Sequence, residues 1–480
     1  MDQNTPFGRL KSAGLYLFRG REEIELLEGP IGKPLFFLSL PLVLTNLFQT
    51  AYNLADTFWL GQYSTEALAA ISFAWPPVFL LMMFGMGISV AGSVLVAQYT
   101  GAGEPREAEV AASQVLAYTT IASLFFGTIA YVVARPFVAL LGASPSVVGL
   151  ASGYLQIVSL GFVFMMTYMV FNALMRGYGD TLTPMVVMFG TVVLNIILDP
   201  FLIFGWTLLE NVPVLGTIGF PELGIRGAAY ATVFSRAVGL SVGLAILFGD
   251  RWGISVHWRE LRPRLDYLVK ILRIGAPASV EGVSRAVSVN LLMFVVGWFS
   301  TPVVAAYGIG TRIFSMVFLP GVAVDRSVET MTGQNIGAEK PDRAAAAARL
   351  AAISLFGILT LLGAVVWYLA TPISALFTDD PAVVDVATTF IRYVAPTFGF
   401  IGVMRAYSGS LRGAGKTLTV AAIAIVMLAI TRFPLAWFLA EAIGETGIWI
   451  GYAVSNVAGA LVAYRWYQRG TWRTKRLVEN

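Results

Sequence analysis

The chain has 480 residues, of which 57% are hydrophobic and only 12% are charged. Soluble domains carry about 25% charged residues, so this composition excludes an ordinary water-exposed surface and predicts that lipid covers much of the outside. The absence of cysteine excludes disulfides and cysteine-bound metals, and the single histidine, His257, excludes histidine-rich metal sites. Basic loops at a membrane surface explain the net charge of +4, so we expect no nucleic-acid partner.

The first 30 residues are polar and contain Glu22, Glu23, Glu25 and Glu28. A cleaved signal peptide would be more basic and would place its apolar run earlier. We therefore expect residues 1–30 to form an amphipathic cytoplasmic arm.

Twelve apolar windows follow, each close to the 20 or so residues that a membrane-spanning helix needs. They lie near Pro34–Leu60, Leu68–Gln98, Ala111–Ala134, Val148–Met175, Thr183–Trp206, Gly224–Phe248, Leu268–Phe299, Pro302–Gly333, Arg349–Leu369, Val384–Leu411, Leu418–Leu439 and Gly447–Tyr464. The sequence thus predicts an all-α integral membrane protein with 12 transmembrane helices.

Lysine and arginine are concentrated in the loops after even-numbered spans and at both ends of the chain. The loop residues are Arg106, Arg176, Arg251, Arg259, Arg262, Arg264, Lys340, Arg343 and Lys416. Positively charged loops face the cytoplasm. We therefore predict a multi-pass protein of the plasma (cytoplasmic) membrane with both termini cytoplasmic.

The two halves of the chain repeat one another. Three matches share an offset of 236 positions: Gln98–Pro105 with Gln334–Pro341, Arg176–Thr183 with Arg412–Thr419, and Pro41 with Pro277. Six spans separate equivalent positions, so the halves have the same orientation, which is a transporter architecture with a site between parallel repeats. We expect two pseudo-symmetric six-helix bundles, an N-lobe over 31–249 and a C-lobe over 268–468. A cytoplasmic linker over 250–267 joins them, and 469–480 forms a cytoplasmic tail.

The first span carries a polar stripe. Gln49, Tyr52, Asn53 and Asp56 fall at positions i, i+3, i+4 and i+7, which places them on one helical face. A carboxylate in the bilayer centre costs roughly 2.5–3.5 kcal/mol on insertion scales. We expect this stripe to face protein or water and not lipid.

The fifth span carries a second acid, Asp199, one turn after Asn195. Both acids fall in the outer half of the bilayer, where Tyr154 of the fourth span and Ala228 and Thr232 of the sixth reach a similar depth. Six helices can therefore surround one pocket that holds two carboxyl groups. Burial and a second nearby acid both favour uptake of a proton or a cation.

The second half does not keep these acids. Leu292 stands where the first half has Asp56, and the region that matches Asp199 reads Arg432-Phe433-Pro434-Leu435. An ionisable pair in one lobe alone favours an ion-binding site there. The alternative is that each acid pairs with a buried arginine, for which Arg236, one turn from Thr232, is the candidate.

Pro41 lies inside the first span, where a proline removes a helical hydrogen bond and clashes with the preceding turn. It therefore predicts a bending point below Asp56. A static kink is the alternative, because membrane helices tolerate prolines.

The C-lobe has its own charges on the seventh and eighth spans: Glu281, Arg285, Arg312, Asp325, Arg326 and Glu329. Opposite signs on adjacent helices indicate a self-neutralising structural network. A gating role is the alternative.

Taken together, the duplicated six-helix lobes, both pairs of repeated elements and the contexts of Asp56 and Asp199 resemble the multidrug and toxic compound extrusion (MATE) family over about residues 30–470. The finer pattern is similar to the prokaryotic branch with archaeal and DinF-like members. The resemblance implies the fold shared by MATE proteins and their superfamily, with the coupling ion bound in the N-lobe. Arg285 stands where a NorM-like C-lobe ion site would have an acid.

The resemblance also assigns roles to single residues. Its cation-site positions, which could hold Na+, are Asp56, Asn195, Ala228 and Thr232. Its surrounding hydrogen-bond network corresponds to Asp199, Tyr52, Tyr154 and Asn172. Gln49 and Met188 match pocket-lining positions, and with Tyr52, Asn53 and Asn172 we expect them to line the substrate pocket. Pro41 matches the proline at which the first helix bends.

From these features we expect a secondary active multidrug efflux antiporter. It would export amphipathic, often cationic, organic compounds in exchange for H+ or Na+ by alternating access, as a monomer and without a cofactor other than the ion. The alternative from the same superfamily is a flippase for lipid-linked oligosaccharides, which would need a cationic cavity. An enzyme is not expected, because there is no cysteine and the one histidine lies in a loop. A receptor or scaffold would leave the two acids unexplained.

Overall fold

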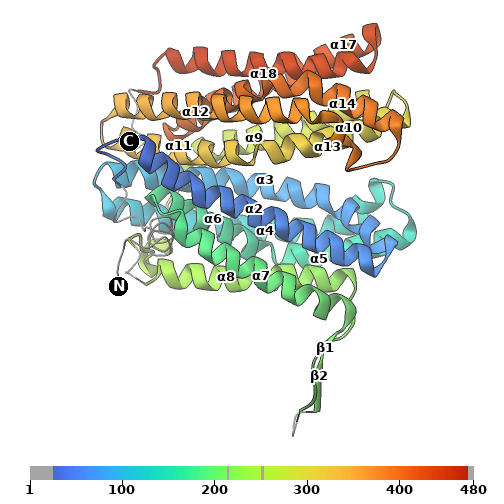
Figure 1. Cartoon of the computed structure of the whole chain (residues 1–480). Helices are drawn as coiled ribbons and strands as arrows, with labels where there is room; N and C mark the ends of the chain where they lie inside the picture. The colour runs from blue at the N-terminus through green and yellow to red at the C-terminus, as the bar shows by residue number, and fades with distance from the viewer. Residues whose placement is uncertain (1–24, 213–215, 250–252, 474–480) are drawn as a thin grey trace, which may run out of the picture. The chain divides into compact units, whose positions relative to one another are not determined.

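The computed structural model describes residues 25–212, 216–249 and 253–473. Most of the expected amphipathic arm (1–24), part of the linker (250–252) and most of the tail (474–480) therefore lie outside the described residues. Figure 1 shows the described chain as a set of long helices.

Among the described residues, the first half of the chain contributes eight helices and one hairpin. They are α2 Gly32–Tyr63, α3 Thr65–Gly101, α4 Pro105–Leu140, α5 Pro145–Leu160, α6 Phe162–Tyr178, α7 Leu182–Phe204, β1 Thr207–Val212, β2 Gly216–Gly219, α8 Ile225–Leu247 and the short 3₁₀ helix η2 Trp258–Leu261.

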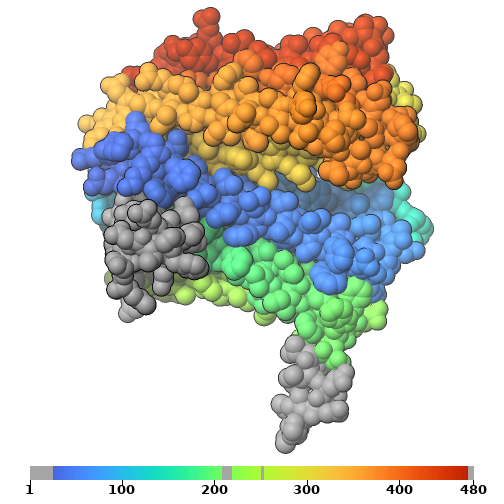
Figure 2. Space-filling model, viewed as in Figure 1, coloured from blue at the N-terminus to red at the C-terminus, as the bar shows by residue number. Residues whose placement is uncertain are grey.

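The second half contributes α9 Leu265–Val296, α10 Thr301–Val317, α11 Leu319–Gly337, α12 Pro341–Tyr368, α13 Ala370–Ala375, α14 Pro381–Val394, η3 Ala395–Thr397, α15 Phe398–Gly413, α16 Thr417–Ile425, the π-helical η4 Val426–Arg432, α17 Phe433–Ile443 and α18 Glu445–Gln468. In the space-filling view, α12, α17 and α18 lie at the surface of the second half (Figure 2).

The number of spans agrees with the prediction from hydropathy. Among the described residues, ten helices are long and apolar enough to cross a membrane, and two bent pairs bring the number to twelve. The pair α5 and α6 bends by 53° at Gly161, and the pair α10 and α11 bends by 41° at Phe318. The predicted all-α, twelve-span fold is confirmed, with these two breaks as additions.

A small antiparallel hairpin interrupts the helical pattern and was not predicted. Strands β1 and β2 follow α7, and their register pairs Thr207 with Gly219 and Val212 with Gly216 (Figure 1). Residues 207–223 lie between two of the predicted spans, and the sequence analysis predicted no structure for them. A two-stranded hairpin needs cross-strand pairing, which hydropathy windows do not detect.

The contacts divide the chain into two compact units. Of the described residues, those within Leu44–Val96 and Pro105–Leu272 form unit 2, and those up to Val43, within Ala97–Glu104 and from Arg273 onward form unit 1. The described part of the linker thus packs within unit 2. There, the Gln114 side chain donates to the carbonyls of Glu260 and Arg262 at 2.5 and 2.7 Å.

The helix α2 is shared between the units. Its residues up to Val43 belong to unit 1, where the Ser39 hydroxyl donates to that of Ser327 in α11 at 2.9 Å. Its residues from Leu44 belong to unit 2. Pro41 therefore lies two residues before the point at which α2 passes from one unit to the other.

The repeated motifs end helices in the same way in both halves. Gly103 and Glu339, which are equivalent by the offset of 236, both have positive φ, and so do the equivalent Gly179 and Gly415. A left-handed residue after a helix satisfies its last carbonyl groups. Helix termination is therefore one structural role of the repeated motifs.

A second role of the repeat is close helix contact inside unit 1. A methyl group added at Gly101 would meet the backbone carbonyl of Gln334, and one added at Gly337 would meet the carbonyl of Gln98. These two contacts are related by the same offset, so the ends of α3 and α11 pack reciprocally. Only glycine permits so close an approach of two backbones.

Candidate functional site

The two N-lobe acids meet inside unit 2. Asp56 is presented by α2 and Asp199 by α7; Asp199 is fully buried and Asp56 is 7% exposed. Their carboxyl groups lie within electrostatic range of each other, and two buried like charges favour uptake of a proton or a cation. The expectation that both acids share one site thus agrees with their position in the structure.

The site has more acceptor oxygens than donors. Asn195 donates its amide to Asp199 Oδ1 at 3.4 Å, one turn along α7. Asp56 Oδ1, Asp199 Oδ2 and Asn195 Oδ1 are buried and receive no N–H or O–H from the described protein groups. Buried acceptors without a donor are costly, so this group of oxygens favours a proton or a cation.

Two tyrosines and a threonine border the acids. Tyr52 donates to the Thr232 hydroxyl at 2.7 Å, which joins α2 to α8. Tyr154, from α5, is buried within electrostatic range of both Asp56 and Asp199. Ala228 is buried one turn before Thr232. All four lie in unit 2 with the acids.

Arg236 does not form an ion pair with either acid among the described residues. Its guanidinium donates to Gln49 Oε1 at 2.9 Å and to the Met188 sulfur at 3.1 Å. It also lies over the ring of Tyr52, with 4.8 Å to the centroid. The expected pocket residues Gln49 and Met188 are therefore joined by an arginine that the sequence had offered only as a partner for the acids.

Two predicted residues have no direct contact with the acids. Asn53 is exposed on α2 and accepts a hydrogen bond from Gln49 at 3.1 Å. Asn172 donates to the Tyr168 carbonyl of its own helix at 2.7 Å. The Tyr168 hydroxyl in turn points at the Met188 sulfur, 3.8 Å away. Tyr168 thus lies in the same cluster as Arg236, Gln49 and Met188. Its role was not predicted from the sequence.

The charged cluster of unit 1 is organised by an arginine that was also missed. Arg412, 1% exposed, contacts Glu281 at 3.2 Å, Asp325 at 3.0 Å and Glu329 at 3.3 Å. Each acid has a second arginine: Arg285, Arg405 and Arg326 respectively. Four positive charges thus face three negative ones. Arg412 belongs to the repeated Arg-Gly element, which was the signal available in the sequence.

Arg432 adds another positive charge inside unit 1. It ends the π-helical η4, and its guanidinium donates to Ser455 Oγ at 2.8 Å and to Asn456 Oδ1 at 2.7 Å. It lies over the Tyr452 ring at 4.2 Å and forms no ion pair with a described carboxylate. Unit 1 therefore buries an excess of positive charge, whereas unit 2 buries paired acids.

The described residues contain no group of three or more histidine, aspartate or glutamate side chains placed to hold a metal ion. A cation at Asp56 would rely on amide, hydroxyl or backbone oxygens beside the two carboxyl groups. Hard cations accept such oxygen ligands.

Comparison with known proteins was made by sequence family, by relatives and by structure. The family model described as MatE matches residues 41–201 and 277–438. These two matches begin 236 positions apart, which is the offset of the repeat.

The chain is 29% identical to a FAD transporter of Shewanella oneidensis over 92% of this chain and 96% of that protein. It is 26% identical to the probable multidrug resistance protein NorM of Thermotoga maritima, over 93% of this chain and 94% of that protein. A crystal structure of the Vibrio cholerae MATE transporter VcmN in the bent form superposes with a TM-score of 0.83, at 25% identity, covering 92% of this chain and 96% of that chain.

Proposed function

The chain belongs to the MatE family, and on this premise we propose that it is a secondary active antiporter that exports amphipathic organic compounds, cationic ones among them, in exchange for H+ or Na+. It is a multi-pass membrane transporter and not an enzyme. What we propose is the coupling ion, the exchange with its direction, and the cargo.

One observation carries the proposal: Asp56 Oδ1, Asp199 Oδ2 and Asn195 Oδ1 are buried together without donors. A proton between the two carboxyl groups would satisfy them, and so would a sodium ion held by their oxygens. A buried acid pair of this kind marks an ion pathway in membrane proteins. A static core would instead pair each acid with an arginine, as unit 1 does.

Ion binding can bias the conformation through α2. This helix carries Asp56 in unit 2 and is anchored by Ser39 in unit 1. Neutralising Asp56 would change its attraction for the surrounding groups and so the orientation of α2 after Pro41. Coupling requires the ion to favour one conformation over the other. We therefore propose that the coupling step lies between Asp56 and Pro41, the predicted bending point of α2.

The cargo would bind beside the ion, where Arg236 donates to Gln49 and Met188 and Gln49 in turn donates to Asn53. Methionine and aromatic side chains adapt to varied apolar ligands. The names of two relatives, a probable multidrug resistance protein and a FAD transporter, both indicate organic cargo for those proteins.

The test uses purified protein in liposomes loaded with a cationic fluorescent dye. An imposed pH gradient and an imposed sodium gradient are applied separately, and dye movement is followed. We expect one gradient to drive transport by the wild type and Asp56→Asn to abolish it. Asp379→Asn removes the same charge from an exposed loop and should transport normally. Gradient-driven transport at the wild-type rate by Asp56→Asn would refute the proposal.

The second candidate function is movement of cargo with an anionic group, including a lipid-linked pyrophosphate. The buried guanidinium of Arg432, which bonds to Ser455 and Asn456 and forms no ion pair with a described carboxylate, favours it. The acids of unit 2 oppose it, because they would repel such a headgroup. Liposomes that scramble a fluorescent pyrophosphate lipid but do not move the dye would favour this second function.

A further inference from the structure

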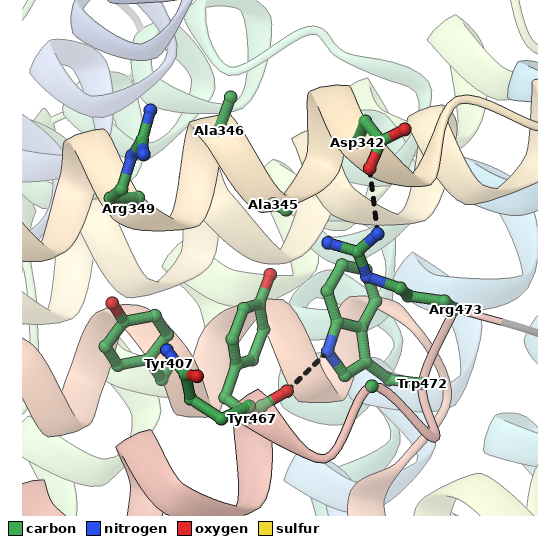
Figure 3. Close-up of a pocket in the computed structure, with 10 residues that line it drawn as sticks. Asp342, Ala345, Ala346, Arg349, Tyr407, Tyr467, Trp472 and Arg473 are labelled. Atoms are coloured by element: carbon green, nitrogen blue, oxygen red, sulfur yellow. Dashed lines mark hydrogen bonds and ion pairs between the residues drawn. The ribbon is translucent and has the colours of Figure 1, made fainter.

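A cavity of about 330 Å³ lies in unit 1 at one end of the membrane spans. It is formed where α12 begins, where α18 ends, and by the residues that follow α18. Its charged and aromatic lining residues are Asp342, Arg349, Tyr407, Tyr467, Trp472 and Arg473. Figure 3 shows the three rings along one wall and Arg349 and Asp342 on the helix opposite.

The aromatic wall is rigid. The rings of Tyr407 and Tyr467 have centroids 4.7 Å apart, and Tyr467 stacks on Trp472 at 4.6 Å. Trp472 donates its indole N–H to the Tyr467 carbonyl at 2.9 Å. Tyrosine and tryptophan are enriched where membrane spans meet water. This wall therefore lies where lipid headgroups are expected.

Some polar groups of the cavity form hydrogen bonds or ion pairs with described residues, and two do not. Arg473 forms an ion pair with Asp342 at 2.8 Å, and Tyr467 shares a hydrogen bond with Ser410. Arg349 is exposed and forms no hydrogen bond or ion pair with a described residue, although its charge acts on Tyr407. The Tyr407 hydroxyl also makes no hydrogen bond, while its side chain is more than nine-tenths buried. The cavity thus presents one unpaired cation and one unused donor.

Apolar surface leads from the cavity along both helices. Ile353 lies one turn after Arg349 on α12 and is 64% exposed. Leu461 and Tyr464 are exposed on α18, at spacings of seven and four residues before Gln468 of the lining. Such a face suits acyl chains. A ligand with a phosphate at one end and hydrocarbon at the other fits both the polar cavity and this apolar face.

We propose that this cavity binds the headgroup of an anionic phospholipid. Arg349 pairs with the phosphate, the Tyr407 hydroxyl donates to it, and the acyl chains run along Ile353 and Leu461. Basic pockets between spans attract anionic headgroups, and the basic side of this chain faces the anionic inner leaflet if the loop charges set its orientation. Free phosphate esters share the headgroup chemistry but would not use the apolar face.

The experiment titrates the delipidated full-length protein with phosphatidylglycerol or phosphatidylcholine of the same acyl chains and counts bound lipid by native mass spectrometry. Both lipids carry the phosphate, but the choline ammonium of phosphatidylcholine offsets its attraction for Arg349. We therefore expect phosphatidylglycerol to bind roughly tenfold more tightly. Arg349→Gln should lose this preference, and Arg349→Lys should keep part of it. Arg312→Gln removes an exposed arginine outside the cavity and should leave the preference intact.

A soluble arm uses glycerol 3-phosphate as the probe. We expect it to compete only weakly, because it lacks acyl chains. Equal binding of the two lipids by the wild type would overturn the proposal, as would an unchanged preference in Arg349→Gln. Glycerol 3-phosphate binding as tight as that of phosphatidylglycerol would also overturn it, in favour of a soluble phosphate ester. Arg349 is exposed, so thermal unfolding should confirm that its variants fold.

Discussion

Buried carboxyl groups are held in two different ways in this protein. Asp56 and Asp199 form no ion pair with a described arginine, and the charge of Arg236 acts on Asp56 without a direct contact. Glu281, Asp325 and Glu329 instead each contact two arginines. An acid that already has its counter-ions gains little from another cation. This contrast is the physical reason to place ion coupling at Asp56.

Arg412 should be the most sensitive residue of the unit 1 cluster. Replacing it with Met would leave three buried acids with one arginine each, and breaking a buried ion pair costs about 3–5 kcal/mol. We expect Arg412→Met to lower the thermal unfolding temperature in detergent strongly. Arg312→Met, which removes an exposed arginine, is the matched control. Equal unfolding temperatures for the two variants would contradict the structural role.

The sequence predicted the acid pair and not the arginine that joins the second cluster. Asp56 and Asp199 could be brought together because span direction fixes their depth in the membrane. Arg412 contacts acids that precede it by 83 to 131 positions, and no helical spacing connects residues so far apart. Arg236 was identified, but its preference for Gln49 and Met188 depends on side-chain geometry that the spacing does not contain.

At the scale of helices, the glycines of the repeated motifs set how closely two helix ends approach. Gly337→Ala should push α11 against the carbonyl of Gln98, and overpacking of this kind costs typically 1–3 kcal/mol. The unfolding temperature of Gly337→Ala should therefore fall. Gly357→Ala, in α12, places its methyl group in open space and should be neutral or slightly stabilising.

Pro41 gives a second prediction about a helix. Pro41→Ala restores a helical hydrogen bond and removes the clash that favours bending. If α2 must bend for transport, this variant should bind dye in the absence of a gradient as the wild type does, yet transport it more slowly. Pro136→Ala, inside α4, is the control. Wild-type transport by Pro41→Ala would identify the proline as a static kink.

Helix number was predictable, and helix interruptions were not. Hydropathy averaged over about 20 residues passes through the bend at Gly161 and through η4 without a signal. A break depends on which backbone groups find other partners. The hairpin β1–β2 was not predicted for a similar reason, because its two short strands are defined by pairing with each other.

For the whole molecule, the loop charges predict both termini in the cytoplasm. The chain has no cysteine, so a single introduced thiol reports its own side. Ser146→Cys, in the exposed first turn of α5, should react with a membrane-impermeant maleimide on intact cells. Asp342→Cys, in the first turn of α12, should react only after permeabilisation. The reverse pattern would invert the predicted orientation.

The duplication offers an internal guide to stability. Glu339 occupies a left-handed backbone position, with φ of 56°, where the equivalent Gly103 of the other half avoids the penalty. A side chain in this conformation costs roughly 1–2 kcal/mol. Glu339→Gly should therefore raise the unfolding temperature, because it places in the second half the glycine that the first half has at the equivalent position. Comparing equivalent positions in this way makes the internal duplication a source of stabilising substitutions for the purified protein.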